Sequence, residues 1–363
     1  MIDLLYHELE DDLRAGVREM LADRSPASKV LARAETGDAY DPKLWRTLAT
    51  EMGLAGLAVP ESRGGAGATW REVAVVCEEL GRAATPTPYL TSSVIATGVL
   101  LGLDEAEALL AELARGARTA ALAVPFDSAP GGRSGAARWA AVDGDALSGE
   151  VRGVADAGAA DVLLVPAGGA LYAVEAADTA RSPVVSLDLT RPLWDVSLDR
   201  AAGRRIATGE QAVTAVEAGL RAGAAMLASE QVGVAEWCLE STVDYLKTRY
   251  QFGRPVGTFQ AVKHRLADVW VALTQARAVA RYAAACLAEG DPDAPVAAAL
   301  AQAHCGPVAV DAAEECVQLH GGIGFTWEHP AHLYLKRAKA DALALGTADR
   351  HRATLAALVD LPA

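Results

Sequence analysis

The chain has 363 residues, of which 52% are hydrophobic, and its 33 basic residues against 47 acidic ones give a formal net charge of −14. This length predicts two or three domains at roughly 150 residues each. The acidic balance argues against binding to nucleic acids, because contact with a phosphate backbone needs a basic surface. No apolar run reaches the roughly 20 residues that span a bilayer, so we expect no association with a membrane.

The cysteines and the start of the chain indicate the compartment. The five cysteines are scattered, without CxxC or any other metal-ligand spacing, so we expect free thiols and no metal site. The N-terminal stretch turns acidic at Glu8 and lacks a basic region followed by an apolar one, so no signal peptide is predicted. Both features favour a cytoplasmic protein.

Residues 1–118 are predicted to form an N-terminal helical domain. Apolar side chains recur on one helical face over 13–21 and again over 70–81, which predicts two helices. Between them, residues 59–67 form a cluster of glycine, proline and polar residues that breaks regular structure.

Residues 119–205 change character and are predicted to form a small middle β domain. Short apolar runs are separated by Gly, Asp and Pro, the pattern of strands bounded by turns. The predicted strands cover 120–124, 139–142, 162–165, 170–174 and 184–187.

Residues 206–363 return to helical periodicity. Long alanine-rich stretches with short Gly- and Pro-containing breaks predict a C-terminal four-helix bundle. The predicted helices cover 211–249, 259–288, 295–319 and 332–358. The fold class expected for the whole chain is therefore mainly α with a small β domain between two helical domains.

Two segments between the predicted C-terminal helices combine unusual residues. In 249–260, a helix ends at a basic residue and a glycine-proline turn follows. The planar guanidinium of Arg249 could grip a phosphate bidentately, or it could cap the helix end in solvent. In 318–330, three glycines within four positions allow a backbone to approach a ligand closely, although they also suit a flexible helix connection.

The order of these two segments resembles a known family. Residues 249–268 read RYQFGRPVGTFQAVKHRLAD, and about fifty residues later 318–324 read QLHGGIG. This order resembles the acyl-CoA dehydrogenase flavoproteins, as do GLAGLAVPE followed by GGAG over 53–67 and EELG over 78–81. The succession of helical, β and helical parts is similar to the three-domain fold of that family.

The resemblance implies a reaction and a cofactor. Family members bind FAD and oxidise an acyl-CoA thioester to the 2-enoyl product: a carboxylate removes the α-proton, and the β-hydride passes to the flavin. An electron-transfer flavoprotein then reoxidises the flavin. In the family the FAD lies across a subunit interface, and Arg249 would reach the pyrophosphate of the neighbouring subunit's FAD. The residues that match cofactor-binding positions are Arg249, Phe252, Gln260, Gln318, Gly321, Gly322 and Thr347.

The chain departs from the family where its own FAD and its base would lie. Residues 123–128 (AVPFDS) stand in place of a TEPxxGSD-like loop, and a tryptophan-bearing strand beside it has no counterpart. The usual Glu of a YEGT-like motif is replaced by Leu345, and an alternative position on the first bundle helix holds Gly223. Glu230 lies seven residues further on, two helical turns or about 10 Å away, and is the remaining candidate base.

Three hypotheses follow. In the first, the chain is the base-lacking subunit of a heteromeric enzyme, similar to the α2β2 acyl-CoA dehydrogenases of actinobacteria that shorten steroid side chains. It would then complete the FAD site of a homologous catalytic partner. In the second, it is a self-sufficient homo-oligomeric dehydrogenase with a displaced base. In the third, it is a flavin-free scaffold or regulatory protein that keeps only the fold.

Overall fold

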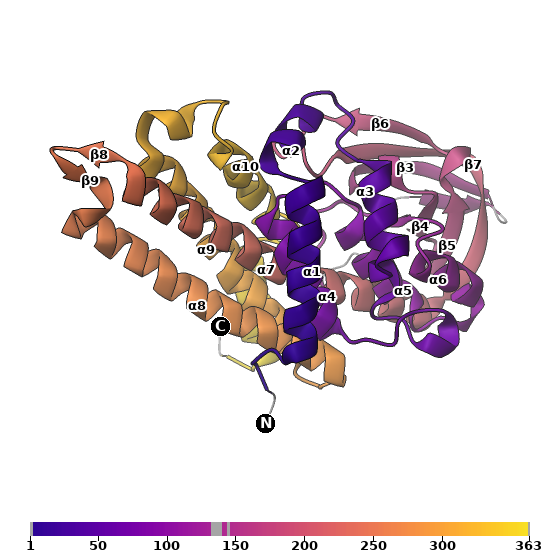
Figure 1. Ribbon diagram of the computed structural model, residues 1–363. Coiled ribbons are helices and arrows are strands. Elements are labelled where there is room, and N and C mark those ends of the chain that lie inside the picture. The colour runs from indigo at the N-terminus through magenta and orange to yellow at the C-terminus, as the bar shows by residue number, and fades with distance from the viewer. Residues whose placement is uncertain (1–2, 132–139, 144–145, 362–363) are drawn as a thin grey trace.

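A sheet lies at one end of the molecule, and long helices extend to the other end (Figure 1). The computed structural model describes residues 3–131, 140–143 and 146–361. N-terminal helices lie beside the sheet, and the helices that follow the sheet in sequence form the opposite end. The predicted fold class, mainly helical with a small β domain between two helical parts, is confirmed.

The N-terminal part consists of α-helices joined by 3-10 and π-helical segments. Both helices predicted there are present, as α1 and α4. The α4 helix begins with a capping box, because the Thr69 hydroxyl accepts a hydrogen bond from the Arg71 amide at 3.1 Å and the Glu72 carboxylate accepts one from the Thr69 amide at 2.8 Å. The helices are α1 Glu8–Arg24, α2 Ala27–Ala34, α3 Pro42–Arg46, α4 Trp70–Arg82, α5 Thr97–Leu100 and α6 Glu107–Ala114.

The middle part is a sheet that has seven strands among the described residues, in the order β1-β4-β5-β7-β3-β2, with β6 also paired to β7. The first pair is parallel and the other pairs are antiparallel. The 16-residue strand β7 pairs with β3, β5 and β6 and so connects the two halves of the sheet. The strands are β1 Ala120–Leu122, β2 Ala140–Asp143, β3 Ala146–Ala155, β4 Val162–Ala167, β5 Ala170–Glu175, β6 Ala180–Val184 and β7 Leu193–Thr208.

The strand predicted over 184–187 is wrong. Strand β6 ends at Val184, and the next residues form an irregular segment in which Val185 is fully exposed, because β7 has no residues left to pair with them. The two longest strands, β3 and β7, escaped prediction because they are rich in Ala, Gly and charged residues of low β-propensity. Trp139, which begins another predicted strand, lies outside the described residues.

The C-terminal part is a set of helices around α7, and a small hairpin marks its far end (Figure 1). A single fourth helix over 332–358 was expected, and this prediction is wrong. The chain breaks between α10 and α11 because Leu345 and Gly346 have φ of 55° and 104°, a backbone that a right-handed helix cannot contain. The elements are α7 Gly209–Thr248, β8 Tyr250–Gln251, β9 Arg254–Pro255, α8 Gln260–Glu289, α9 Ala294–His320, α10 Ala331–Asp341 and α11 Ala348–Leu358. Within the described ranges, none of the helices combines the length and apolarity that crossing a membrane requires.

Helices α4 and α7 approach each other at glycines, and this contact joins the N-terminal part to the bundle. A Cβ atom on Gly233 would lie 1.8 Å from the carbonyl oxygen of Glu78, and one on Gly81 would lie 2.1 Å from the carbonyl oxygen of Glu230. Only residues without a side chain allow the two backbones to come so close. The position of Glu230 in the molecule is therefore fixed by this crossing.

Candidate cofactor and acyl-binding sites

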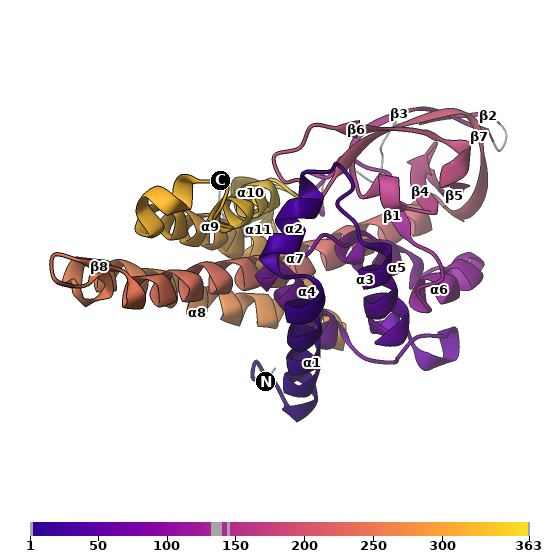
Figure 2. The same cartoon turned by 45° about the horizontal axis from the view of Figure 1, so that its top comes forward.

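The first predicted FAD-contacting segment lies at the end of the bundle that is farthest from the sheet (Figure 2). Arg249 directly follows α7 and is exposed, and the β8–β9 hairpin continues from it. Phe252, at the tip of this hairpin, has φ of 53° and leaves 89% of its surface exposed. Gln260 is the exposed first residue of α8. The segment therefore presents a guanidinium, an aromatic ring and an amide to the outside of the chain.

The second predicted segment lies beside the first. Gln318 is exposed in the last turn of α9, and Gly321 and Gly322 are exposed at the start of the 3-10 helix that follows. Between them, the buried His320 stacks on Tyr245 of α7 with 4.6 Å between ring centroids. This stacking connects the last turn of α7 with the glycine segment, so the structure brings six of the seven predicted cofactor residues to one end of the bundle.

Thr347 is the residue that the structure does not bring to this end. Its hydroxyl caps α11 by accepting a hydrogen bond from the Arg350 amide at 3.3 Å. The preceding residue, Gly346, lies against Ala129 of the middle part, and Figure 2 shows α11 well away from β8. Thr347 therefore begins a helix beside the sheet domain.

Exposed aromatic side chains gather around the two predicted segments. Tyr250 and Phe252 belong to the hairpin, while Phe325 and Trp327 belong to the 3-10 helix and the turn after it, and each leaves more than 60% of its surface exposed. Exposed apolar surface of this kind indicates contact with another molecule. We define these four residues as the aromatic end of the bundle.

The two positions that a catalytic Glu would occupy lie side by side in the core. Leu345 is 1% exposed, and a Cβ built on Gly223 would lie 3.1 Å from the Leu345 Cδ1 and 2.7 Å from the Ile95 Cγ1. Leu220 completes the apolar surroundings, and the cavity that remains there measures about 20 Å³. Such a space holds about one water molecule and has no room for an acyl chain.

The loop over 123–128 lines a larger pocket of about 550 Å³ between the sheet and the bundle. Within this loop, the backbone amide and carbonyl of Phe126 already form hydrogen bonds inside the chain. The Phe126 amide donates to the Gly153 carbonyl at 3.0 Å, and the Phe126 carbonyl accepts from the Leu345 amide at 2.7 Å. Exposed Val185 and Leu187 form much of the rim. The pocket thus offers mainly apolar surface.

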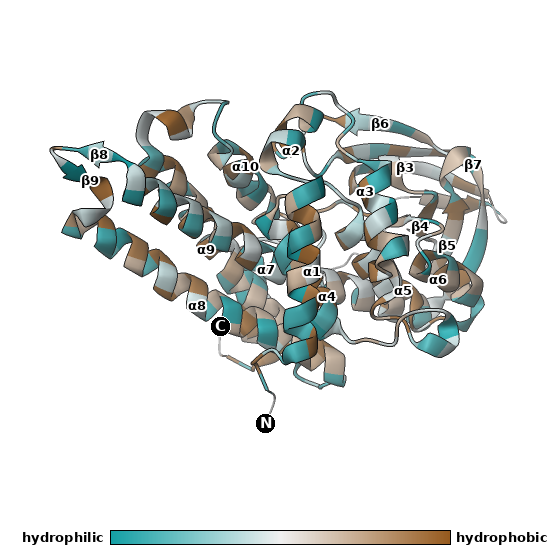
Figure 3. Cartoon of the chain, viewed as in Figure 1, coloured by the Kyte–Doolittle hydropathy of each residue, from teal (hydrophilic) through white to brown (hydrophobic). Residues whose placement is uncertain are grey.

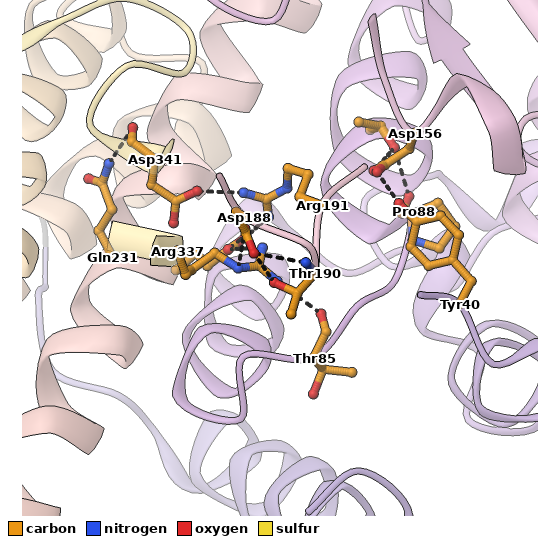
Figure 4. A network of polar contacts seen from close by, with 12 residues as sticks. Tyr40, Thr85, Pro88, Asp156, Asp188, Thr190, Arg191, Gln231, Arg337 and Asp341 are labelled. Carbon is orange, nitrogen blue, oxygen red and sulfur yellow. Dashed lines mark hydrogen bonds and ion pairs between the residues drawn. The ribbon is translucent and has the colours of Figure 1, made fainter. Parts of the chain in front are cut away.

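Glu230 lies in a buried cluster of charged side chains. Figure 4 labels the other four members, Asp188, Arg191, Arg337 and Asp341. Both of its carboxylate oxygens accept hydrogen bonds from Arg191 Nη2 at 2.7 Å, and Oε1 also accepts one from Arg337 Nη1 at 2.8 Å. Arg191 Nη1 donates to Asp341 Oδ1 at 2.6 Å, and Arg337 Nε lies 3.0 Å from Asp188 Oδ2. We call these five residues the buried ion cluster.

Burial dominates the electrostatics of the cluster. It raises the pKa of Asp341 to about 8, with the Glu230 carboxylate adding to the effect and the two guanidinium groups opposing it. Burial also raises the pKa of Asp156 nearby, which accepts hydrogen bonds from Tyr40 and Thr91. A carboxyl group with a pKa of about 8, such as that of Asp341, holds its proton at neutral pH.

Sequence reasoning missed every member of the buried ion cluster except Glu230. Arg337 and Asp341 stand in the sequence YLKRAKAD, where the high share of charge suggests a solvated helix face. The available signal was the spacing of four residues between them, which places both on one face of α10. Asp188 and Arg191 carried no local pattern, because they lie in an irregular segment.

Family models match both helical parts of the chain. The description "Acyl-CoA dehydrogenase, N-terminal domain" matches residues 7–117, and "Acyl-CoA dehydrogenase, C-terminal domain" matches residues 213–359. A curated relative, the acyl-CoA dehydrogenase IpdE2 of Mycobacterium tuberculosis (strain ATCC 25618 / H37Rv), is 36% identical over 331 residues, which cover 91% of this chain and 91% of the relative.

Solved structures agree with the sequence matches. A variant of the Tcur3481-Tcur3483 steroid ACAD is 30% identical with a TM-score of 0.85, and the match covers 97% of this chain and 98% of that one. A chain of the ChsE4-ChsE5 complex from Mycobacterium tuberculosis is 29% identical with a TM-score of 0.87, and the match covers 100% of both chains. The similarity therefore spans all three parts of the fold.

Proposed function

The chain belongs to the acyl-CoA dehydrogenase family, and from that premise we propose that it is the non-catalytic subunit of a hetero-oligomeric FAD-dependent acyl-CoA dehydrogenase. The observation that carries the proposal is the filled core at the expected base positions. Leu345, Gly223 and Ile95 are in contact there and leave about 20 Å³, so the described residues at these two positions offer neither a proton acceptor nor space for an acyl group. The base and the acyl pocket then belong to a homologous partner.

The exposed end of the bundle supports the second half of the proposal. Members of the family bind FAD, and the residues at this end fit part of that molecule. The guanidinium of Arg249 and the amides of Gln260 and Gln318 are donors for a diphosphate, while Gly321 and Gly322 have no heavy atom within 4 Å of an added Cβ. These groups would bind and orient the cofactor of the partner, and the aromatic end would exclude water from the contact.

The loop over 123–128, which stands in place of the family's flavin-binding loop, fits the cofactor less well. The backbone amide and carbonyl of Phe126 are already hydrogen-bonded to Gly153 and Leu345. FAD, when bound, supplies the hydride acceptor for α,β-dehydrogenation of an acyl-CoA thioester. We therefore propose that the cofactor lies between the bundle end of this chain and the partner, in an α2β2 assembly in which each pair of unlike chains shares one site.

The buried ion cluster argues against the alternative of a displaced base. Glu230 is buried and both of its carboxylate oxygens accept hydrogen bonds from guanidinium groups, so neither oxygen is free to reach a substrate. We propose that Glu230 is a structural residue. The names of the similar proteins suggest the substrate class, because one is a steroid ACAD, so a steroid side-chain CoA thioester is the proposed substrate and an electron-transfer flavoprotein the proposed electron acceptor.

Co-expression tests the proposal. The chain is produced alone and together with a family member that keeps a catalytic Glu, and flavin content and dehydrogenation of acyl-CoA thioesters are measured. We expect flavin and turnover only in the complex. The partner produced alone is the control, because it shows whether this chain is needed. Full FAD occupancy and turnover by the lone chain would overturn the proposal, and a complex without flavin absorption would favour a scaffold.

A further inference from the structure

The buried ion cluster connects all three parts of the fold. Asp188 and Arg191 come from the segment that follows β6, Glu230 from α7, and Arg337 and Asp341 from α10. Arg337 Nη2 also donates to the carbonyl of Thr85 in the N-terminal part, at 3.4 Å. The cluster is thus the place where the irregular segment 185–192, which forms the rim of the 550 Å³ pocket, is attached to the helices.

The charges of the cluster do not balance. Three carboxylates face two guanidinium groups, and each of the five residues is at most 6% exposed. An uncompensated buried charge is costly, and a buried carboxyl normally neutralises itself by taking up a proton. One proton on one carboxylate makes the cluster neutral.

The hydrogen bonds indicate which carboxylate takes the proton. Glu230 accepts on both oxygens from guanidinium groups, and Asp188 accepts from the amide and hydroxyl of Thr190 while its other oxygen faces Arg337. Asp341 has a single partner, Arg191, on Oδ1, and its buried Oδ2 has no hydrogen-bond partner among the described residues. Asp341 is therefore the least stabilised anion of the three.

Other titratable groups around the cluster do not supply the missing positive charge. Asp156 faces both guanidinium groups and would add negative charge if ionised, whereas Tyr40 and Cys77 are neutral because burial raises the pKa of each. Lys336 is a further cation, and burial lowers its pKa while the Asp188 carboxylate opposes that shift. Its charge acts on Asp188 and is not among those that act on Asp341, so Asp341 gains no further positive partner.

We propose that Asp341 carries a proton at neutral pH and that this proton keeps segment 185–192 attached to the bundle, so that alkaline pH releases the segment. The proposal does not depend on the function proposed above. The direction of the pH dependence follows from the two pKa values of Asp341. The folded chain holds the proton up to a pH of about 8, whereas the unfolded chain releases it near the ordinary aspartate pKa of 3.8. Unfolding therefore releases a proton, and the contribution to stability is lost as the pH rises between these two values.

Asp341→Asn tests the proposal, because an amide imitates the neutral acid in size. Urea unfolding of the full chain is measured from pH 6 to pH 8, and hydrogen exchange of peptides over 185–192 is followed up to pH 9. Relative to Asp341→Asn, the unfolding constant of the natural chain should rise about tenfold per pH unit. In the natural chain, hydrogen exchange over 185–192 should accelerate with pH more than the intrinsic exchange rate does. In Asp341→Asn it should follow the intrinsic rate. The control is Asp349→Asn, an exposed carboxylate on α11 that should behave as the natural chain does.

Infrared spectroscopy keeps the proposal testable if Asp341→Asn fails to fold. The natural chain should show the C=O stretch of a protonated carboxylic acid at pH 6, and this band should weaken in parallel with the attachment of the segment as the pH rises. Parallel stability curves for the natural chain and Asp341→Asn would overturn the proposal. So would hydrogen exchange over 185–192 that follows only the intrinsic pH effect.

Discussion

Glu230 lies where two guanidinium groups converge, and its replacement distinguishes a structural role from a catalytic one. Glu230→Gln removes the negative charge and leaves Arg191 and Arg337 with fewer partners in a buried site. We expect a loss of about 3–5 kcal/mol in the free energy of unfolding, as is typical when one partner of a buried ion pair is removed.

Glu240→Gln is the matched control for this prediction. Glu240 lies on the same helix and pairs with Arg82 at 2.6 Å, but half of its side chain is exposed, so we expect a change below about 1 kcal/mol. Urea unfolding measures both variants. Unchanged stability in Glu230→Gln, together with lost turnover in the complex, would instead identify a base.

Arg249 is the residue for which the proposed function makes the sharpest prediction. Because its side chain is exposed at the end of α7, Arg249→Ala should leave the stability of the chain unchanged. In the complex with a catalytic partner, it should weaken FAD binding roughly 10- to 100-fold, the usual effect of losing a hydrogen bond to a charged group. Fluorescence titration of the apo-complex with FAD measures the affinity, and Lys247→Ala, exposed in the last turn of α7, is the control. Equal affinities in both variants would contradict the assignment.

For single residues, sequence reasoning works where the residue belongs to a motif of neighbouring residues. Arg249 and Gly321 stand in ordered motifs, and both are exposed at the end of the bundle where Tyr245 stacks on His320. Thr347 was matched through its neighbours Leu345 and Gly346, but no motif reveals that its hydroxyl caps a new helix. Asp188 and Asp341 interact through space with partners more than a hundred residues away, so no local pattern marks them.

The crossing of α4 and α7 depends on glycine, and this is testable at the scale of the elements. Gly233→Ala would place a Cβ 1.8 Å from the Glu78 carbonyl oxygen, so the two helices must separate. We expect a destabilisation of about 3 kcal/mol, at the upper end for overpacking because the contact is with backbone. Gly16→Ala in α1 is the control, since no atom lies within 4 Å of its Cβ, and it should stabilise the chain by about 0.5–1 kcal/mol. Thermal unfolding measures both variants, and a change in stability of the same sign in Gly233→Ala and Gly16→Ala would contradict the prediction.

Helices were more predictable than strands. Regular apolar spacing gave α4 to within one residue and gave α8 and α9 to within one or two. Strand β7 was missed because one of its faces meets solvent and carries charge, and because Ala and Gly replace the β-branched residues that mark a strand. The break between α10 and α11 was missed because Leu345 adopts positive φ, a conformation that its residue type does not predict.

The aromatic end of the bundle should make the lone chain associate with itself. Four large aromatic side chains exposed at one end of the bundle favour contact with another molecule. We expect sedimentation velocity to show association of the lone chain, and Phe252→Ser combined with Trp327→Ser to weaken it roughly tenfold or more.

A double variant away from the aromatic end is the control. Leu5 and Leu9 are equally exposed near α1, and replacing both with Ser should leave the association unchanged. Addition of the catalytic partner should replace self-association with a defined complex. Equal effects of the two double variants would contradict a specific role for the aromatic end.

For the whole molecule, the sequence predicted the fold class and the separation of the cofactor residues from the missing base. It could not predict how the parts meet, because the α4–α7 crossing, the filled space at Leu345 and the buried ion cluster arise from residues far apart in the chain. The hydropathy of α8 illustrates why such contacts are hard to predict (Figure 3). Apolar and polar residues alternate over most of this helix, and the pattern alone does not say which apolar residues face a partner.

The position of β7 in the sequence has a consequence for synthesis of the protein. Its partners β3, β5 and β6 all precede it, so a nascent chain that ends at residue 192 has strands with open edges and no central strand. Such edges invite pairing with other chains. Translation of the 16 residues of β7 takes roughly 1–3 s, and during this interval the nascent chain is most in need of a chaperone.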